Sequence, residues 1–317
     1  MEGCDTVNGE AANDGEVGHT HLWSFAFLDD REGNEWVSWF TEESLLLGVD
    51  GVDFGPVGAV WVGSRSGDAV ARYLNSSWFH FDRLATAEND SSGLFDFGGN
   101  MLSLAALPNG EIWVTQFNSG GILRYVPAAV AGQENDQYDH LTDENSALSG
   151  TFIIQIVPHP AGPIFFLSDR HGADLLLEPD RWRDPSQWIH LPSSGIGGET
   201  IRDAAVASDD VIWFAVEDVG VVRWDVNGTA GPNEPLTWQD ATDDRWDAII
   251  DAPGSDYVFT ATQSLAVDTD GSIWAGGPGL LRFSYDPEFG TVEALAYYVE
   301  KGDAFQEGLL RNRVADL

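Results

Sequence analysis

Residues 264–283 read SLAVDTDGSIWAGGPGLLRF. They predict a strand, a tight Asp-Gly turn, a strand that ends in Trp, a glycine-rich turn and a third strand. The same unit recurs along the chain. Its aromatic residue recurs at intervals of 52, 52, 48 and 61 residues, at Trp61, Trp113, Phe165, Trp213 and Trp274. A period near 50 residues accommodates four antiparallel strands with their turns, which is the length of one β-propeller blade.

Three further columns follow the same register. Nine residues before each aromatic lies an apolar residue of the expected inner strand: Val52, Leu104, Ile156, Ala204 and Leu265. About ten residues after the aromatic, in the expected third strand, four copies have an arginine: Arg72, Arg124, Arg223 and Arg282. The middle copy has Leu176-Leu177 at this place instead. Aromatic residues mark an expected outer strand: Trp36, Trp78, Tyr138, Trp188, Trp238 and either Tyr297 or Tyr298. Four columns in one register predict an all-β propeller of four-stranded antiparallel blades.

The copies are incomplete at both ends. Residues 1–21 are acidic and almost free of large apolar side chains, so we expect a flexible leader there and a propeller over 22–317. Residues 22–41 resemble the last two strands of a blade, and 308–317 resemble the first. We expect six blades, five of them complete and the sixth either composite or truncated, with seven blades as the alternative.

Composition narrows the choice of partners. The 52 acidic and 15 basic residues of the 317-residue chain give a net charge of -37, and Lys301 is the only lysine. Such a surface repels phosphate backbones and anionic membranes, which excludes nucleic acid as an expected partner. No apolar run is long enough to span a membrane, and no signal peptide is recognisable. The single cysteine, Cys4, excludes an intrachain disulfide; it is either the lipidated first residue of a mature bacterial lipoprotein or an exposed thiol.

The repeat resembles the two-component regulator propeller family. The resemblance rests on the Asp-x-Asp-Gly-Ser-Ile-Trp-Ala-Gly pattern of 268–276, on Gly-Leu-Leu-Arg-Phe at 279–283, and on the closing GLLRNRVADL of 308–317. It implies an extracytoplasmic propeller, periplasmic, secreted or lipid-anchored, that senses a ligand. The chain departs from the sensor kinases of this family because it shows no kinase motif and no transmembrane helix.

Candidate ligand-binding residues lie where the copies differ. The loops between the second and third strands share a face with the links between blades, and in propellers this face and the central channel hold ligands. The candidates are these loop residues together with two inner-strand residues: Arg65, Gln116, Asn118, Asp169, Arg170, His171, Arg202, Asp203, Glu217 and Asp218. The alternative interpretation is that the loops are simply solvated polar segments.

The sequence predicts neither catalytic residues nor a metal site. The column lining the expected channel contains only two carboxylates and no histidine: Gly51, Ser103, Gln155, Asp203, Ser264 and Asp316. We therefore expect no cofactor, and a calcium ion at the channel lacks support. The outer-strand histidines His80, His140 and His190 belong to different blades. We interpret Asp268–Gly271 as a hairpin turn, and the repeated arginines as structural partners of nearby carboxylates.

Together these observations favour a non-catalytic, monomeric, extracytoplasmic propeller that binds a small molecule or a glycan. Two alternatives stay open. One is a platform for a protein partner in a cell-surface complex. The other is a metal-dependent propeller lyase or lactonase.

Overall fold

The computed structural model describes residues 6–7, 10–11, 21–25, 36–40, 49–64, 70–75, 77–81, 101–116, 120–126, 137–191, 196–198, 200–229 and 237–298. The chain divides into two compact units, Met1–Met101 and Leu102–Leu317. Within the described part, the second unit carries four complete blades and the first carries one. The closing segment 308–317, and with it the predicted composite blade, lies outside the described residues.

Among its described residues, the first unit contains one four-stranded sheet and two short hairpins. Strands β1 and β2 pair with each other, and β3 pairs antiparallel with β4 as expected for the partial blade. The four-stranded sheet is the sequential meander β5-β6-β7-β8. Its elements are β1 (Thr6–Val7), β2 (Glu10–Ala11), β3 (His21–Phe25), β4 (Trp36–Phe40), β5 (Val49–Phe54), η1 (Pro56–Gly58), β6 (Val60–Ser64), β7 (Val70–Leu74) and β8 (Ser77–Phe81).

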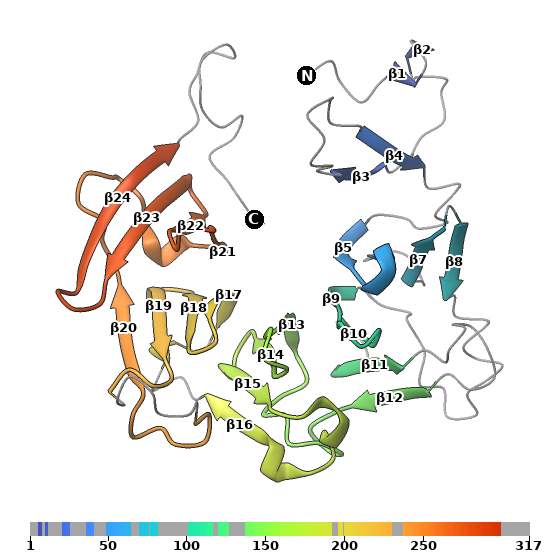
Figure 1. Ribbon diagram of the computed structural model, residues 1–317, viewed down its shortest axis with the longest axis horizontal. Helices are drawn as coiled ribbons and strands as arrows, with labels where there is room; N and C mark the ends of the chain where they lie inside the picture. The colour runs from blue at the N-terminus through green and yellow to red at the C-terminus, as the bar shows by residue number, and fades with distance from the viewer. Residues whose placement is uncertain are drawn as a thin grey trace. The chain divides into compact units, whose positions relative to one another are not determined.

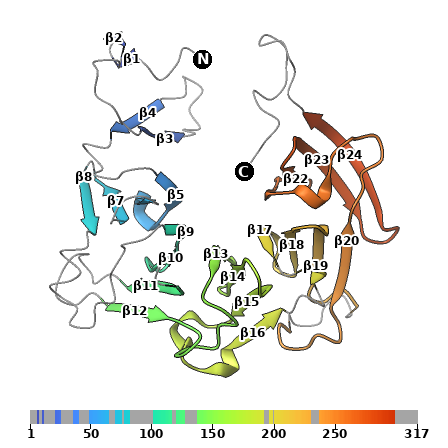
Figure 2. The same ribbon diagram turned by 180° about the vertical axis from the view of Figure 1, so that it is seen from behind.

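The described part of the second unit forms four sequential four-stranded meanders, which confirms the predicted blades (Figures 1 and 2). The blade β9–β12 comprises β9 (Met101–Ala106), β10 (Ile112–Gln116), β11 (Ile122–Val126) and β12 (Gln137–Leu141). The blade β13–β16 comprises β13 (Ile153–Pro158), β14 (Ile164–Ser168), β15 (Ala173–Leu176), η2 (Pro179–Arg181), η3 (Pro185–Gln187) and β16 (Trp188–Leu191). The blade β17–β20 comprises β17 (Ile201–Ser208), β18 (Val211–Val216), β19 (Gly220–Asp225) and β20 (Arg245–Ile249). The blade β21–β24 comprises η4 (Phe259–Ala261), β21 (Ser264–Val267), β22 (Ile273–Gly276), β23 (Leu280–Asp286) and β24 (Thr291–Tyr298).

Stacking of the blades explains why the second strands are almost entirely apolar. In β14, Ile164 and Phe166 pack towards β9–β12, whereas Phe165 and Leu167 pack towards β17–β20. Successive side chains of a strand point to opposite faces, and both faces of this sheet are covered by a neighbouring blade. Continuous apolar runs are typical of strands buried on both sides. The core of the second unit therefore lies between the blades.

The aromatic column faces the next blade along the chain. The Trp113 ring contacts Phe166 at 5.7 Å, and the Trp213 ring contacts Phe283 at 6.0 Å. In three blades the arginine of the third strand pairs directly opposite the aromatic residue of the second strand. Its guanidinium carbon lies 5.5–5.6 Å from the centroid of the indole ring, a cation–π contact: Arg72 over Trp61, Arg124 over Trp113 and Arg282 over Trp274. The predicted arginine column is therefore confirmed.

The middle blade corrects one register prediction. The residue opposite Phe165 is Leu175, so the departing pair is Leu175-Leu176 rather than Leu176-Leu177. The loop before β15 is one residue shorter than in the blade before it. Here an aromatic–leucine pair replaces the Trp–Arg pair, which shows that an apolar contact can replace the cation–π contact at this position.

The outer-strand column also needs correction in the blade β17–β20. Trp246, not Trp238, lies in β20, where it is opposite Trp224 and stacks on it at 5.1 Å. Trp238 lies in the long connection before β20 and packs on the edge of Trp224 at 5.7 Å. In the last blade, Tyr297 is opposite Leu281, away from the column's register. In the blade β17–β20 the long connection 226–244 moved the aromatic out of the fixed spacing. In the last blade the connections are short, and the pairing of β23 with β24 shifts register between Arg282 and Phe283.

The Asp268–Gly271 segment is a hairpin turn, as predicted. Asp268 N–H donates to Ser272 O at 2.8 Å, and Gly271 adopts φ 82°, a left-handed conformation that glycine tolerates. Arg282 Nη2 lies 2.6 Å from Asp270 Oδ2 and 3.2 Å from Asp268 Oδ2. The two carboxylates are therefore occupied by arginine, which confirms the structural interpretation.

Candidate functional site

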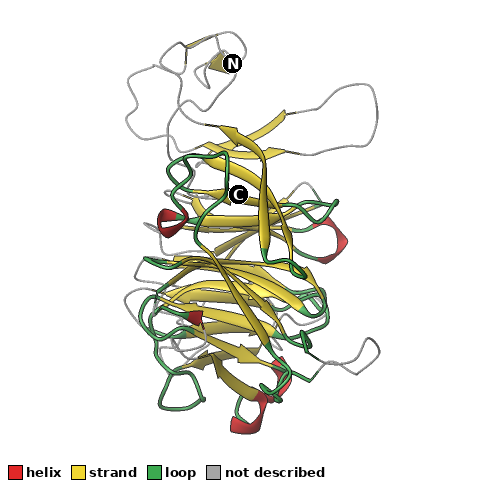
Figure 3. Ribbon diagram, turned by 90° about the vertical axis from the view of Figure 1, so that its left-hand side faces the viewer, coloured by secondary structure: helices red, strands yellow, loops and turns green. Residues whose placement is uncertain are grey.

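The candidate loops of the second unit lie on one face, which we call the loop face. It comprises the loops 117–121, 169–172, 217–219 and 277–279 and the links 142–152, 192–200 and 250–263, as far as these are described. The hairpin turns 107–111, 159–163, 209–210 and 268–272 lie at the opposite strand ends, on the turn face. Strand direction alternates along each meander, so this division follows from the topology. Figure 3 shows the strands of this unit running between loops at both ends.

Backbone hydrogen bonds tie the loops to the links between blades. Gly121 N–H donates to Thr151 O at 2.6 Å, which joins the first loop to the link before β13. The carbonyl oxygen of Thr200 accepts a hydrogen bond from Glu217 N–H at 3.0 Å, and the Thr200 hydroxyl donates to Asp169 O. Asp218 N–H then donates to Thr260 O at 3.3 Å. These bonds hold the loops of consecutive blades in fixed positions.

Arg202 joins the two loops that carry most of the predicted residues. Its Nη2 donates to Glu217 Oε1 at 2.6 Å, and its Nη1 donates to Asp169 Oδ1 at 3.5 Å. Its side chain retains 30% exposure, and that of Glu217 retains 43%. Asp218 at the loop tip adopts φ 62°, which aspartate tolerates better than most residues. The ion pairs leave charged groups available to solvent.

Arg170 and His171 complete the group on the neighbouring loop. Both backbone N–H groups donate to the buried Ser168 Oγ at 3.2 Å. The side chain of Arg170 is 80% exposed, and its Nε lies 3.8 Å from Asp169 Oδ2. The His171 ring packs on Gly150, where an added Cβ would come within 2.5 Å of the ring. The group therefore offers two guanidiniums, three carboxylates and an imidazole, which suits the recognition of polar ligands.

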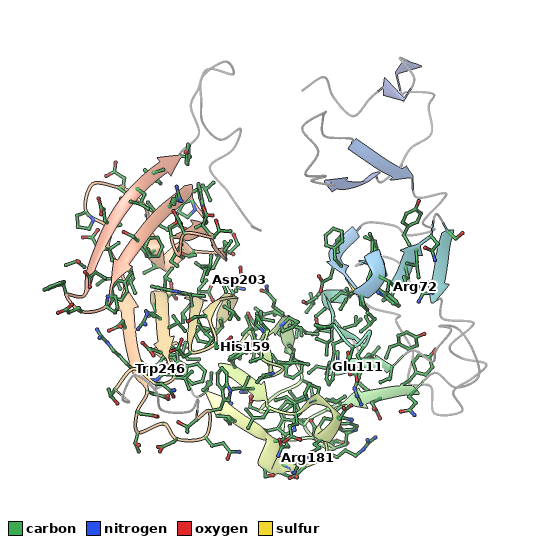
Figure 4. The ribbon with its side chains drawn as sticks, in the orientation of Figure 1. Arg72, Glu111, His159, Arg181, Asp203 and Trp246 are labelled. Carbon is green, nitrogen blue, oxygen red and sulfur yellow. The ribbon has the colours of Figure 1, made fainter. Side chains whose placement is uncertain are left out.

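Asp203 has a structural role in holding three blades together (Figure 4). One carboxylate oxygen accepts from Gln155 Nε2 and from its own neighbour Ala204 N–H, each at 2.7 Å. The other accepts from Leu265 N–H at 2.6 Å. Asp203 is only 6% exposed. These bonds account for its place in the inner-strand column, and the ligand-binding role predicted for it stays a prediction.

The described residues do not gather a metal centre. No group of three or more His, Cys, Asp or Glu side chains among them could hold a metal ion. Two of the outer-strand histidines have local partners instead: His140 Nε2 lies 2.8 Å from Gly120 O, and His190 Nδ1 lies 2.9 Å from Asp174 Oδ1. The loop-face group likewise contains ion pairs rather than a nucleophile bonded to a base.

The structure brings together Asp169, Arg202 and Glu217 by direct contacts, with Arg170, His171 and Asp218 on the same two loops. Arg65 and Asn118 lie outside the described residues, and Gln116 ends β10 without a described side chain. Sequence reasoning missed Thr200, Ser168 and Gly150, which position the loops. Their roles depend on contacts with other segments, so the repeat pattern carried no signal for them.

A cluster of aspartates on the turn face gives a prediction for pH dependence. Burial raises the pKa of Asp244 to about 6, and the neighbouring Asp243, Asp240 and Asp225 add to the shift. The folded state therefore holds this proton more tightly than the unfolded state, where the pKa is near 3.8. Stability from protonation is present below about pH 4 and is lost as the pH rises through about 6.

We expect Asp244→Asn to raise the free energy of unfolding at pH 7 by about 1 kcal/mol, because it removes a charge that burial and the neighbouring aspartates disfavour in the folded state. Water screens part of this charge, which keeps the effect small. Below pH 4 the variant and the parent should be equally stable. Urea unfolding between pH 3.5 and 7.5 measures the difference, with Glu293→Gln, an exposed carboxylate on β24, as the control. A difference that does not change with pH would contradict the assignment.

Comparison with solved structures supports the propeller fold. The chain aligns with PorZ, a surface component of the type-IX secretion system of Porphyromonas gingivalis, at TM-score 0.60 and 15% identity, over 95% of this chain and 43% of that one. It aligns with the extracellular domain of the hybrid two-component system BT3049 from B. thetaiotaomicron at TM-score 0.53 and 14% identity, over 84% of this chain and 36% of that one. It aligns with virginiamycin B lyase from Staphylococcus aureus at TM-score 0.51 and 13% identity, over 87% of this chain and 74% of that one.

These similarities show an all-β propeller fold. This chain spans about a third of the length of the two-component protein domain and less than half of PorZ. No protein-family model matches the sequence, and no curated protein matches it. Among the described residues, no helix is both long enough and apolar enough to cross a membrane.

Proposed function

We propose that this chain is a non-catalytic, extracytoplasmic ligand-binding propeller that recognises a small molecule or a glycan on its loop face. One observation carries the proposal: the loops that differ between copies are fixed by bonds to the links and present Asp169, Arg170, His171, Arg202, Glu217 and Asp218 together. Two solved neighbours, PorZ and the two-component protein domain, are a surface component and an extracellular domain, which supports this location.

Ligand binding is tested with the whole chain and a defined set of compounds. We expect at least one member of a glycan array, or of a millimolar panel of sugars and small acids, to raise the melting temperature. Arg170→Ala should then raise the Kd at least about tenfold, since it removes a side chain that makes only a weak contact within the protein. Asp209→Asn, in a hairpin turn on the opposite face, is the control and should leave the Kd unchanged. A folded protein that binds no compound would contradict the proposal.

A protein-binding platform is the second candidate, and one observation favours it. The link 250–263 exposes two apolar side chains on the loop face, with Ile250 69% and Val258 51% exposed. Exposed apolar side chains beside charged groups are a common feature of protein interfaces. This alternative predicts partners that stay bound at high salt and are lost on Ile250→Asp, with no response to the compound panel.

The lyase or lactonase alternative rests on the similarity to virginiamycin B lyase, which extends to the fold alone. It requires turnover of lactone or uronate substrates that disappears with a chelator. The non-catalytic proposal is supported by the bonds around Asp203, which give this channel carboxylate a structural role.

A further inference from the structure

A pocket on the turn face is lined by residues of the two neighbouring blades β13–β16 and β17–β20. Its volume is about 600 Å³, and its lining residues are Leu177, Thr237, Trp238, Gln239 and Asp240. Leu177 follows β15, and the other four belong to the connection between β19 and β20. Both segments leave their strands at the turn face, so the pocket is separate from the loop-face site. Its volume lies in the range typical of sites for small molecules.

Trp238 forms the aromatic wall of this pocket and is held by both blades. Its indole contacts three buried aromatic rings edge to face, with centroids 5.2–6.1 Å apart: His159, Phe165 and Trp224 (Figure 4 labels His159). The next residue, Gln239, donates from Nε2 to Ser186 O on η3 at 3.0 Å. These contacts fix the indole and the segment beside it.

Two carboxylates at the pocket carry negative charge without a basic partner. Asp240 Oδ1 accepts from Thr242 Oγ1 at 2.6 Å and from Thr242 N–H at 3.0 Å, and these bonds hold the pKa of Asp240 below its usual value. Asp243 Oδ2 accepts from the lining residue Thr237 at 3.1 Å, and Asp243 Oδ1 is buried with no partner in the described part of the chain. Neither carboxylate forms an ion pair with a described basic residue.

The surroundings of the pocket favour a positive charge. Burial, together with the carboxylates of Asp243, Asp240 and Asp225, raises the pKa of the adjacent Asp244 to about 6. A charge that repels carboxylate ionisation attracts cations, and the net charge of -37 on the chain adds to this attraction. An indole is the side chain that binds organic cations best, through its π electrons. A neutral saccharide also stacks on an indole, but it leaves the carboxylate charge uncompensated.

We propose that this pocket binds an organic ammonium cation, with the charged head against the Trp238 indole and beside Asp240 Oδ2. Asp240 Oδ2 has no hydrogen-bond partner among the described residues, because the Thr242 bonds use the other oxygen. Leu177 offers apolar surface to the alkyl groups of such a ligand. The side-chain carbonyl of Gln239 offers an acceptor for a ligand hydroxyl, since only its amide nitrogen bonds to Ser186.

Choline is the probe, because it combines a quaternary ammonium head with one hydroxyl. Calorimetric titration of the full chain at low ionic strength should give a Kd of about a millimolar. The uncharged isostere of choline, in which a tert-butyl group replaces the trimethylammonium head, should bind at least about tenfold more weakly. In heteronuclear NMR spectra, choline should shift the indole N–H signal that is lost in Trp238→Phe.

Two variants test the assigned residues. Asp240→Asn keeps an acceptor for Thr242 and should raise the Kd for choline about fivefold. Trp238→Phe should raise it about threefold, because a phenyl ring binds cations less strongly than an indole. Glu293→Gln removes an exposed carboxylate on β24, away from the pocket, and is the matched control that should leave the Kd unchanged.

Four results would overturn the proposal in distinct ways. A folded protein that binds no choline would exclude the site. Equal affinity for choline and its uncharged isostere would show that shape rather than charge is recognised. An unchanged Kd in both folded variants would show that choline binds the acidic surface in general. Glucose that shifts the Trp238 signal at lower concentration than choline would make this a saccharide site.

Discussion

Arg124→Leu is expected to lower the free energy of unfolding by about 4 kcal/mol, because it leaves a buried carboxylate without its counter-charge. Arg124 donates from Nη2 to Glu111 Oε1 at 2.6 Å and from Nε to Glu111 Oε2 at 2.7 Å. The two residues are only 6% and 4% exposed (Figure 4 labels Glu111). Asp139 and Asp180 also accept from the same guanidinium, at 3.3 and 2.5 Å.

The middle blade supplies the control for this prediction. At the positions of Glu111, Trp113 and Arg124 it carries Pro163, Phe165 and Leu175, so an apolar solution exists at the same site. The double variant Glu111→Leu/Arg124→Leu should therefore recover about half of the loss, since no buried charge is stranded between them. Arg181→Leu, which removes two exposed ion pairs, should give no measurable change. Urea unfolding measures all three, and a double variant no more stable than Arg124→Leu would refute the argument.

Asp203→Ala should cost about 3 kcal/mol, because the buried Leu265 N–H and the half-buried side chain of Gln155, both from other blades, lose their acceptor. Gln155 Nε2 and Leu265 N–H lie on β13 and β21, so one side chain joins three inner strands. Asp203→Asn should cost less, since an amide keeps one acceptor oxygen.

Ser103→Ala is the comparison for Asp203→Ala, because it removes a single bond of the same kind and should cost about 1 kcal/mol. Denaturant midpoints and slopes of the three variants give the values. If Asp203→Ala lowered the free energy of unfolding no more than Ser103→Ala, the Asp203 carboxylate would not be the main link between the inner strands. The ligand-binding role predicted for it would then gain weight.

The proposed ligand site is of a different kind from these structural positions. Arg170 is mostly exposed and makes one long contact, so its loss should change binding far more than stability. Measuring both the Kd and the free energy of unfolding for Arg170→Ala and Asp203→Ala distinguishes a residue that binds ligand from one that holds the fold together.

The candidate site was predictable in part. The sequence placed Asp169, Arg170, His171, Glu217 and Asp218 in two loops on one face, because alternating strands send every second loop to the same end. It did not show that Arg202 bridges Asp169 and Glu217, or that Thr200 holds both loops. Those contacts join residues up to 33 positions apart and depend on how neighbouring blades stack.

The blades follow from local features of the chain: turn chemistry such as Asp268–Gly271 and a recurring Trp are local signals, and each meander forms from neighbouring strands. The sequence spacing misplaced the outer-strand aromatic at Trp238, because a long connection changes spacing without changing the sheet. The packing of the blades brings Asp203 into contact with two other blades and Arg124 into contact with Asp180, 56 residues away, and no sequence pattern predicted either contact. Such contacts form between sheets rather than within them, and no local periodicity specifies which side chains meet there.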